Sequence, residues 1–167
     1  MIVIRRPVLT DAASVGRAWE DARQFYSNLD SRAFLPPNPE DHELGRAIVE
    51  KLIAAAELPD RWIRIAELDA EAVGFITATL HQPVENANRE IMRDETRRLV
   101  KIDTLAVQRS YWRKGFGRTL IEDVEDWAKG VEATLLKVGT YAHSPAVAFY
   151  ETLGYSHRAI IFEKYLD

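Results

Sequence analysis

Residues 99–130 combine three kinds of sequence that together constrain the fold. The stretch "LVKIDTLAV" (99–107) is apolar on both faces, which is typical of a strand in the middle of a sheet. A basic turn with Gly115 and Gly117 follows, and apolar residues then recur at helical spacing from Leu120 to Ala128. A buried strand, a glycine turn and an amphipathic helix in this order favour a mixed α/β fold.

The remaining chain alternates between the two periodicities, with no internal repeat and no evident linker. We predict strands at 2–6, 61–68, 71–80, 133–141 and 155–166, and helices at 11–26, 39–55 and 144–153. Asn38 followed by Pro39 resembles a helix N-cap with a first-turn proline. Residues 82–98 are polar without clear periodicity, and either a solvated linker or a substrate-facing loop fits them. We expect a single domain over 1–167.

Charge and composition exclude several classes of function. Lys and Arg total 22 against 26 Asp and Glu, so no excess of positive charge attracts nucleic acid or an anionic membrane. The chain has no cysteine, which removes disulfides, thiol nucleophiles and cysteine-based zinc sites, and we expect no metal. Its apolar runs are shorter than the ~20 residues of a membrane helix. We therefore expect a soluble, cytoplasmic protein.

The glycine turn suits an anion bound at a helix N-terminus. "QRSYWRKGFGRTL" does not match the Walker loop, and it lacks the third glycine of the dinucleotide fingerprint. The first amides of a helix have no intrahelical partners, and glycines let ligand oxygens approach the backbone. Taken alone, however, the two glycines also fit a tight turn or close helix packing.

The stretch "LAVQRSYWRKGFGRTLI" resembles motif A of the GCN5-related N-acetyltransferase (GNAT) superfamily. Three further stretches resemble other parts of that family in the family's order: "RPVLTDAASV", "IAELDAEAVGFITA" and "SPAVAFYETLGY". The resemblance implies one α/β domain with a twisted, mixed but mostly antiparallel sheet. That sheet would have six to seven strands and about four flanking helices, with a V-shaped splay between the fourth and fifth strands.

The resemblance also implies acetyl-CoA as cosubstrate. Strand backbone from Leu105 to Val107 would pair with the pantetheine arm, and turn amides would hold the pyrophosphate. The implied cofactor-binding residues are Leu105, Ala106, Val107, Arg113, Lys114, Gly115, Phe116, Gly117, Arg118 and His143. Trp112 stands where the family usually has Gln or Arg, and His143 stands where many members have a cofactor-contacting Asn.

Acetyl transfer to an amine needs a proton acceptor for the amine and a proton donor for the departing thiolate. By resemblance, Tyr150 is the donor, and the amine attacks directly through a tetrahedral intermediate. Asp103 is our first candidate for the base, and strand alternation predicts that it shares a face with Lys101 and Leu105. An ion pair with Lys101 is its structural alternative, and Glu67, His81 and His143 are rival bases.

The acceptor is less well defined by the sequence. Relatives build the acceptor site from the first two helices and the loop after the hairpin, so we name Tyr26, Asp30, Phe34 and His81 as candidate substrate-binding residues. The resemblance implies an N-acetyltransferase acting on a primary amine of a small molecule or peptide, and a homodimer. A non-catalytic acyl-CoA sensor with the same fold is the alternative.

Overall fold

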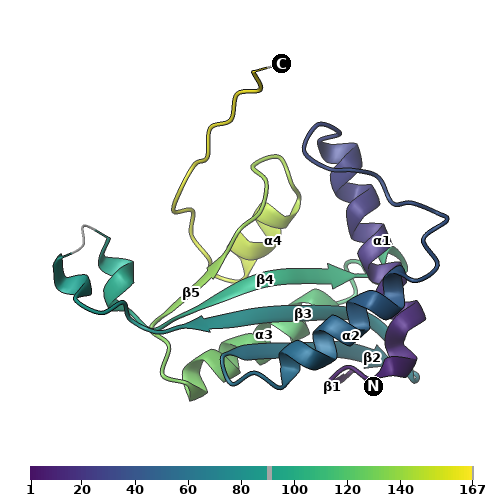
Figure 1. Cartoon of the computed structure of the whole chain (residues 1–167), viewed down its shortest axis with the longest axis horizontal. Coiled ribbons are helices and arrows are strands. Elements are labelled where there is room, and N and C mark those ends of the chain that lie inside the picture. The colour runs from purple at the N-terminus through teal and green to yellow at the C-terminus, as the bar shows by residue number, and fades with distance from the viewer. Residues whose placement is uncertain (90–91, 167) are drawn as a thin grey trace.

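The computed structural model describes residues 1–89 and 92–166 (Figure 1). The strands are β1 (Val3–Arg5), β2 (Arg61–Leu68), β3 (Glu71–His81), β4 (Leu99–Val107) and β5 (Leu135–Val138). The α-helices are α1 (Ala12–Leu29), α2 (Leu44–Ala56), α3 (Phe116–Gly130) and α4 (Ala146–Thr152). Short 3-10 turns are η1 (Leu9–Asp11), η2 (Ala87–Arg89), η3 (Arg93–Thr96) and η4 (Arg109–Tyr111).

The five strands form one sheet in the order β1-β2-β3-β4-β5. Neighbours from β1 to β4 are antiparallel, whereas β4 and β5 are parallel. The tight turn of the β2–β3 hairpin places Asp69 and Ala70 at positive φ, 50° and 65°. A parallel partner requires a crossover connection, and α3 supplies it between β4 and β5.

Helices cover both faces of the sheet. On one face, α1 and α2 bury Val15, Val49 and Leu52 against residues of β2 and β3 such as Ile65 and Phe75. Gly16 and Gly45 allow the two helices to approach closely, because a Cβ built on Gly45 would lie 2.2 Å from the Ala12 carbonyl oxygen. The first two helices therefore form a layer fixed to the centre of the sheet.

The opposite face is covered by α3. Its apolar stripe, Phe116, Leu120, Ile121, Val124 and Ala128, packs with residues from β2, β3 and β4 in the larger core cluster. Both ends of this stripe are buried, Phe116 being 4% and Ala128 5% exposed. The direction of α3 across the sheet, and hence the position of its N-terminus, is set by this contact.

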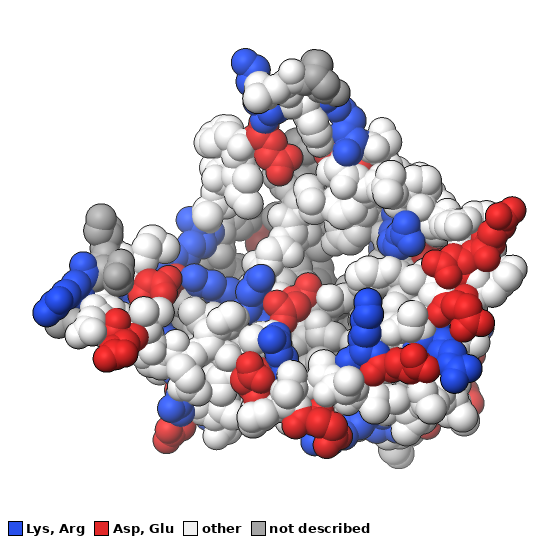
Figure 2. Space-filling view, in the orientation of Figure 1, with Lys and Arg blue, Asp and Glu red and all other residues white. Residues whose placement is uncertain are grey.

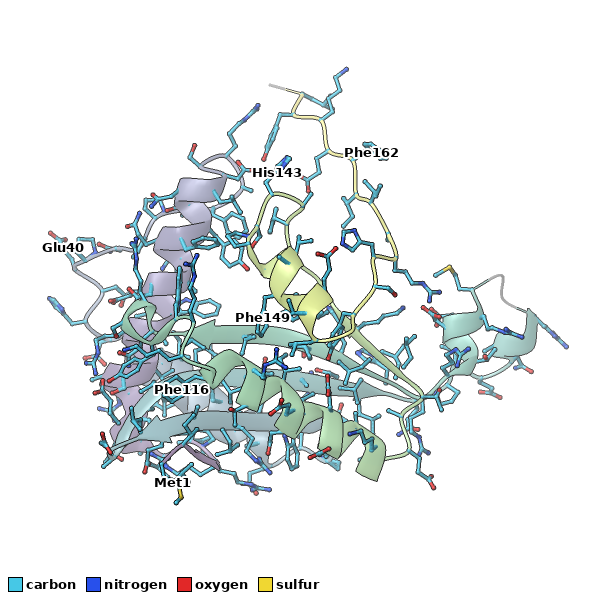
Figure 3. All side chains as sticks on the ribbon, turned by 180° about the vertical axis from the view of Figure 1, so that it is seen from behind. Met1, Glu40, Phe116, His143, Phe149 and Phe162 are labelled. Atoms are coloured by element: carbon cyan, nitrogen blue, oxygen red, sulfur yellow. The ribbon has the colours of Figure 1, made fainter. Side chains whose placement is uncertain are left out.

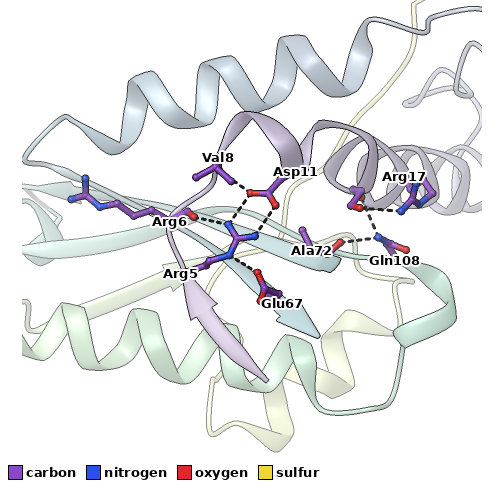
Figure 4. Close-up of polar contacts among 9 residues, drawn as sticks. Arg5, Arg6, Val8, Asp11, Arg17, Glu67, Ala72 and Gln108 are labelled. Atoms are coloured by element: carbon purple, nitrogen blue, oxygen red, sulfur yellow. Dashed lines mark hydrogen bonds and ion pairs between the residues drawn. The ribbon is translucent and has the colours of Figure 1, made fainter. Parts of the chain in front are cut away.

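Buried polar groups join the N-terminal elements to the sheet (Figure 4). Arg5 donates to both carboxylate oxygens of Asp11, at 2.9 and 2.8 Å, and to Glu67 at 2.6 Å. At the far end of β4, the Gln108 amide nitrogen donates to the carbonyls of Ala72 at 2.8 Å and Ser14 at 3.2 Å. These bonds tie β1, β2, β3, α1 and the end of β4 together.

Two sequence predictions about elements are wrong. Within the described residues the sheet has five strands rather than six to seven, because residues 155–166 form no strand and extend away from the sheet (Figure 1). Helix α2 starts at Leu44 rather than near Pro39, since the Asn38 side chain accepts a hydrogen bond from the Glu40 N–H at 3.1 Å and forms a local turn. In the described residues, no helix is long and apolar enough to cross a membrane.

Candidate active site

The candidate site begins where β4 and β5 part. Their pairing runs from Leu99 with Leu135 to Ile102 with Val138, whereas β4 continues to Val107. Among the residues that the structure describes, residues 103–107 therefore have β3 on one side and no strand neighbour on the other. The predicted V-shaped splay lies here, and it leaves backbone donors and acceptors of β4 available to a ligand.

The glycine turn lies beyond the end of β4 and leads into α3. Gly115 is the N-cap of α3 with φ of 92°, and Arg113 also has positive φ, 60°. The first hydrogen bond of α3 runs from the Thr119 N–H to the Gly115 carbonyl, at 3.0 Å. The N–H groups of residues 116–118 lie before this bond in the chain and, by helix geometry, have no intrahelical acceptor. The turn therefore presents amides, a helix dipole and exposed basic side chains to an anion.

Side chains fix the turn at both ends. Phe116 is buried and its ring meets that of Tyr111 edge-on at 5.5 Å. The indole nitrogen of Trp112 donates to the Val107 carbonyl at 2.7 Å. The centroid of its ring lies 5.4 Å from that of Phe25 on α1. Trp112, the residue that departs from the family pattern, thus braces the turn against β4 and α1.

Tyr150 lies on α4, across the splay from β4. The centroid of its ring lies 5.2 Å from that of Phe149 and 5.6 Å from that of Tyr155. The side chain packs against the larger core cluster. Burial raises the pKa of Tyr150 to about 12, with a smaller contribution from Tyr26. The phenol is therefore neutral at physiological pH and can donate a proton. Phe149 points toward the start of α3 (Figure 3), where its Cζ lies 3.4 Å from a Cβ built on Gly117.

Asp103 lies at a β-bulge. Thr77 pairs with Thr104 and Ala78 with Ile102, so Asp103 is the extra residue of β4. Its carboxylate accepts a hydrogen bond from Thr79 at 2.5 Å and lies 3.6 Å from the Lys101 ammonium, so the ion pair considered as its structural alternative is present. Asp103 shares the α1/α2 face with Lys101, whereas Leu105 packs on the α3 face. The predicted alternation therefore holds for Lys101 and fails for Leu105, because the bulge inserts one residue before Leu105.

Three aromatic rings gather between α1 and the loop after β5. Tyr26 and Phe34 stack with their ring centroids 5.0 Å apart. The ring centroid of Tyr141 lies 4.8 Å from that of Phe34 and 5.9 Å from that of Tyr26. Asp30 shapes the loop after α1 that carries Phe34, because its side chain accepts hydrogen bonds from the N–H groups of Arg32 and Ala33. Burial, together with Glu163 and Asp30, raises the pKa of Tyr141. The structure therefore brings together three of the residues named for the acceptor.

Other named residues lie elsewhere. His143 is exposed in the loop before α4 (Figure 3). Glu67, on β2, forms an ion pair with Arg5 of β1. His81 pairs with Leu99 at the closed end of the splay. The loop 82–98 also leaves the sheet at that end (Figure 1), and its Glu90 and Ile91 lie outside the described residues. The rest of this loop contains η2, η3 and a buried Asp94.

Sequence reasoning missed Tyr141 and the bracing role of Trp112. Tyr141 follows β5 by three residues, and an aromatic residue just after a strand that borders the splay was the available signal. The contact between Trp112 and Phe25 joins segments far apart in the chain, and no local pattern indicates it. In the described part of the chain, no group of three or more potential metal ligands occurs.

Comparison with known proteins identifies a matching family and several similar structures. The model of the acetyltransferase (GNAT) family matches residues 19–155. A mutant of the BH1408 protein from Bacillus halodurans has a similar structure, with a TM-score of 0.81 at 19% identity over 98% of this chain and 99% of that one. Glucosamine-6-phosphate N-acetyltransferase from Arabidopsis thaliana gives 0.59 at 17% identity over 100% and 99%. AAC(6′)-Iy bound to a CoA bisubstrate analogue gives 0.61 at 20% identity, covering 99% of each chain.

Gly115 has a left-handed backbone conformation that residues with a Cβ adopt only at a cost. A Cβ added there would meet no atom within 4 Å, so the cost of Gly115→Ala is confined to the backbone. We expect the variant to lose about 1–2 kcal/mol of unfolding free energy, measured by urea denaturation. Gly130→Ala, at the other end of α3, is the control and should keep or gain stability, since it also has open space but no positive φ. Equal stability of the two variants would contradict the assigned turn.

Proposed function

Because the chain belongs to the acetyltransferase (GNAT) family, we propose that it transfers an acetyl group from acetyl-CoA to a primary amine of a small molecule or peptide. The observation that carries the proposal is the splay between β4 and β5, with the α3 N-terminus at its open end and Tyr150 across it. An open strand edge suits the amides of a pantetheine arm, an anion-binding turn suits a pyrophosphate, and a neutral phenol suits a departing thiolate.

The residues present fit acetyl-CoA. Backbone groups of Leu105 to Val107 would pair with the amides of the pantetheine arm, and the amides of residues 113–118 would hold the pyrophosphate. The Val107 carbonyl already accepts a hydrogen bond from the Trp112 indole, so the pairing would use the remaining backbone groups of this stretch. A Cβ on Gly117 would lie 3.4 Å from the Phe149 Cζ and 3.9 Å from the Leu105 Cδ2, so glycine lets the start of α3 pack closely on β4 and α4. His143 is exposed in the loop before α4 and is proposed to contact the cosubstrate from there. When bound, acetyl-CoA supplies an activated acyl group as a thioester.

Tyr150 is the proposed proton donor to the CoA sulfur. Its raised pKa of about 12 keeps the proton on the phenol until the thiolate leaves. As the amine displaced the thiolate, the Tyr150 phenol would give its proton to the sulfur, and a proton from solvent would later restore the phenol. The amine proton is taken up by a base or by water, so charge balances over the reaction.

Asp103 is the proposed base. It lies on the same sheet face as α1 and α2, and the hydrogen bond from Thr79 orients its carboxylate. Arg61 in turn donates to Thr79, which makes the orientation part of a short polar chain. A carboxylate here could accept the proton directly or through water.

The acceptor side is proposed to include Tyr26, Phe34 and Asp30. Stacked aromatic rings and nearby carboxylates suit a protonated amine before it loses its proton. Relatives with similar folds include, by name, an aminoglycoside acetyltransferase and a glucosamine-6-phosphate N-acetyltransferase. These names support a polar small-molecule amine. His81, at the closed end of the splay, is a proposed contact only for an extended acceptor.

Acetyl-CoA should raise the melting temperature of the protein, because it would bind only the folded state. Gly117→Leu should abolish that increase, since a leucine side chain would collide with Phe149 and Leu105 and move the start of α3 away from β4. Gly130→Leu on the same helix is the matched control and should retain the increase. Differential scanning fluorimetry with acetyl-CoA and with free CoA measures both. No increase for the unmodified chain would remove the cosubstrate assignment.

Tyr150→Phe should lower kcat by roughly 100-fold or more while leaving acetyl-CoA binding intact. Thiol release is followed over a panel of polyamines, aminoglycosides, amino acids and peptide N-termini. Tyr155→Phe is the control, because Tyr155 is also a half-buried phenol but donates to Glu125 at 3.1 Å. An unchanged kcat in Tyr150→Phe would exclude it as donor. Binding of acetyl-CoA without thiol release on the whole panel would favour the non-catalytic sensor.

Asp103→Asn should lower kcat/KM for the amine most strongly below the pKa of the amine, where a base is most needed. The loss should reach roughly 100-fold. Asp126→Asn, a surface carboxylate paired with Lys129, should leave the pH profile unchanged. If the Asp103→Asn profile overlays that of the unmodified chain, the amine loses its proton to water and the assignment fails.

A further inference from the structure

The sheet face that carries α1 and α2 has a polar strip beside these helices. Ile63 of β2 belongs to the core cluster under the helices, and Arg61, two residues earlier, lies on the same face. Arg61 pairs with Thr79 of β3. Thr79 in turn pairs with Lys101 of β4, and Lys101 pairs with Lys137 of β5. Residues paired across a sheet point to the same face, so these four side chains form one row, here named the polar strip.

Two cations of the polar strip are only partly neutralised. Lys101 is 56% exposed and lies 3.6 Å from the Asp103 carboxylate, and its ammonium makes no hydrogen bond within the described residues. The same carboxylate accepts a hydrogen bond from Thr79 at 2.5 Å. Arg61 donates to the Thr79 hydroxyl, and its Nε lies 3.8 Å from Asp60. Both cations therefore keep donors that an added acceptor could use.

Lys137 shares its carboxylate with another cation. Its ammonium lies 2.6 Å from Asp94, which is 2% exposed and also holds Arg158 at 2.9 Å. In the described chain, the ion pairs along the polar strip thus join four cations to three carboxylates. Lys101 and Lys137 are direct cross-strand neighbours, and like charges in that position destabilise a sheet. A local positive excess in a chain of net charge −4 indicates a site for an anion.

The polar strip borders the place where acetyl transfer is proposed. Asp103 follows Lys101 by two residues, and Gly139 follows Lys137 by two residues just beyond the paired part of β5. A Cβ on Gly139 would meet no atom within 4 Å, so the surface is open there. Two residues along a strand span about 6–7 Å, which suits an amine and an acid group at opposite ends of a short aliphatic chain. Figure 2 shows this side of the molecule, where Lys and Arg side chains gather beside a hollow near the middle of the view.

We propose that the polar strip binds an anionic group, a carboxylate or a phosphate, of the amine that is acetylated, an inference that rests on the proposed transfer function. The amine lies at Asp103 beside Gly139, and the acid group lies between Lys101 and Lys137, which donate to its oxygens. The bound oxyanion supplies the missing negative charge between the two ammonium groups. Tyr141 follows Gly139 by two residues, so the amine end faces the aromatic rings and the acid end faces the lysines.

Matched pairs of amines test this acceptor class. Thiol release is compared for phosphoethanolamine against ethanolamine, and for γ-aminobutyrate against γ-aminobutyramide, so that the two pairs separate phosphate from carboxylate. We expect kcat/KM to be roughly 10-fold higher for the acid member of at least one pair. Lys101→Gln and Lys137→Gln should each remove that preference while leaving kcat/KM for the neutral member unchanged. Lys129→Gln is the control, because Lys129 is also an exposed lysine paired with a carboxylate.

Two kinetic results would overturn the inference. One is equal kcat/KM for the acid and neutral members of both pairs in the unmodified chain. The other is an equal loss for both members in Lys101→Gln, because that result would show that Lys101 acts only through the Asp103 carboxylate. Retention of the acid preference when both lysines are replaced would also place the anion elsewhere.

A binding measurement separates this inference from the proposed transfer function. Differential scanning fluorimetry is run with free CoA, which carries no acyl group, and with each amine in turn. The acid member should raise the melting temperature more than its neutral partner, and the variant with Gln at both residues 101 and 137 should lose that difference. If the difference is found but no amine is acetylated, the anion site stands and the transfer function fails. If amines are acetylated but no pair shows a thermal difference, the transfer function stands and the anion site is overturned.

Discussion

The partial pairing of β4 with β5 is the constraint on which the rest of the molecule depends. These two parallel strands pair over four residues and then diverge, so the backbone of β4 beyond that point has no hydrogen-bond partner from β5. The chain places the start of α3 at the open end of the space between them and Tyr150 of α4 across it. Any ligand that enters meets strand backbone, helix amides and a phenol, and all three are consequences of the same divergence.

The precision of the site comes from the core rather than from the site itself. Phe116 is buried beneath the turn, so the amides beside it are oriented by apolar packing and not by charged side chains. Gln108, also buried, ties the end of β4 to α1 and β3. Trp112 adds a contact from the turn to α1. A cosubstrate recognised through such amides makes few demands on the identity of Arg113, Lys114 or Arg118.

Local patterns predicted the elements that local physics controls. β2 and β4 occupy the residues expected from their apolar sequences, and α3 follows its glycine turn as expected. The failures are non-local. Residues 155–166 have strand character, but a strand forms only when it is paired, and these residues pair with none of the described strands. The face of Asp103 depends on a bulge set by β3, and the position of Tyr141 depends on packing with α1.

The short length of β5 has a consequence for how the molecule opens. All four of its residues are only half-buried, and α4, which follows, has no fully buried residue. The layer of α1, α2 and the first three strands is far better anchored, so the segment from β5 onward should open in a separate, cheaper step than global unfolding. A ligand that spans the splay bonds to both halves and couples them. Hydrogen exchange would then register its arrival as slower opening of α4, while the amides of β3 exchange as before.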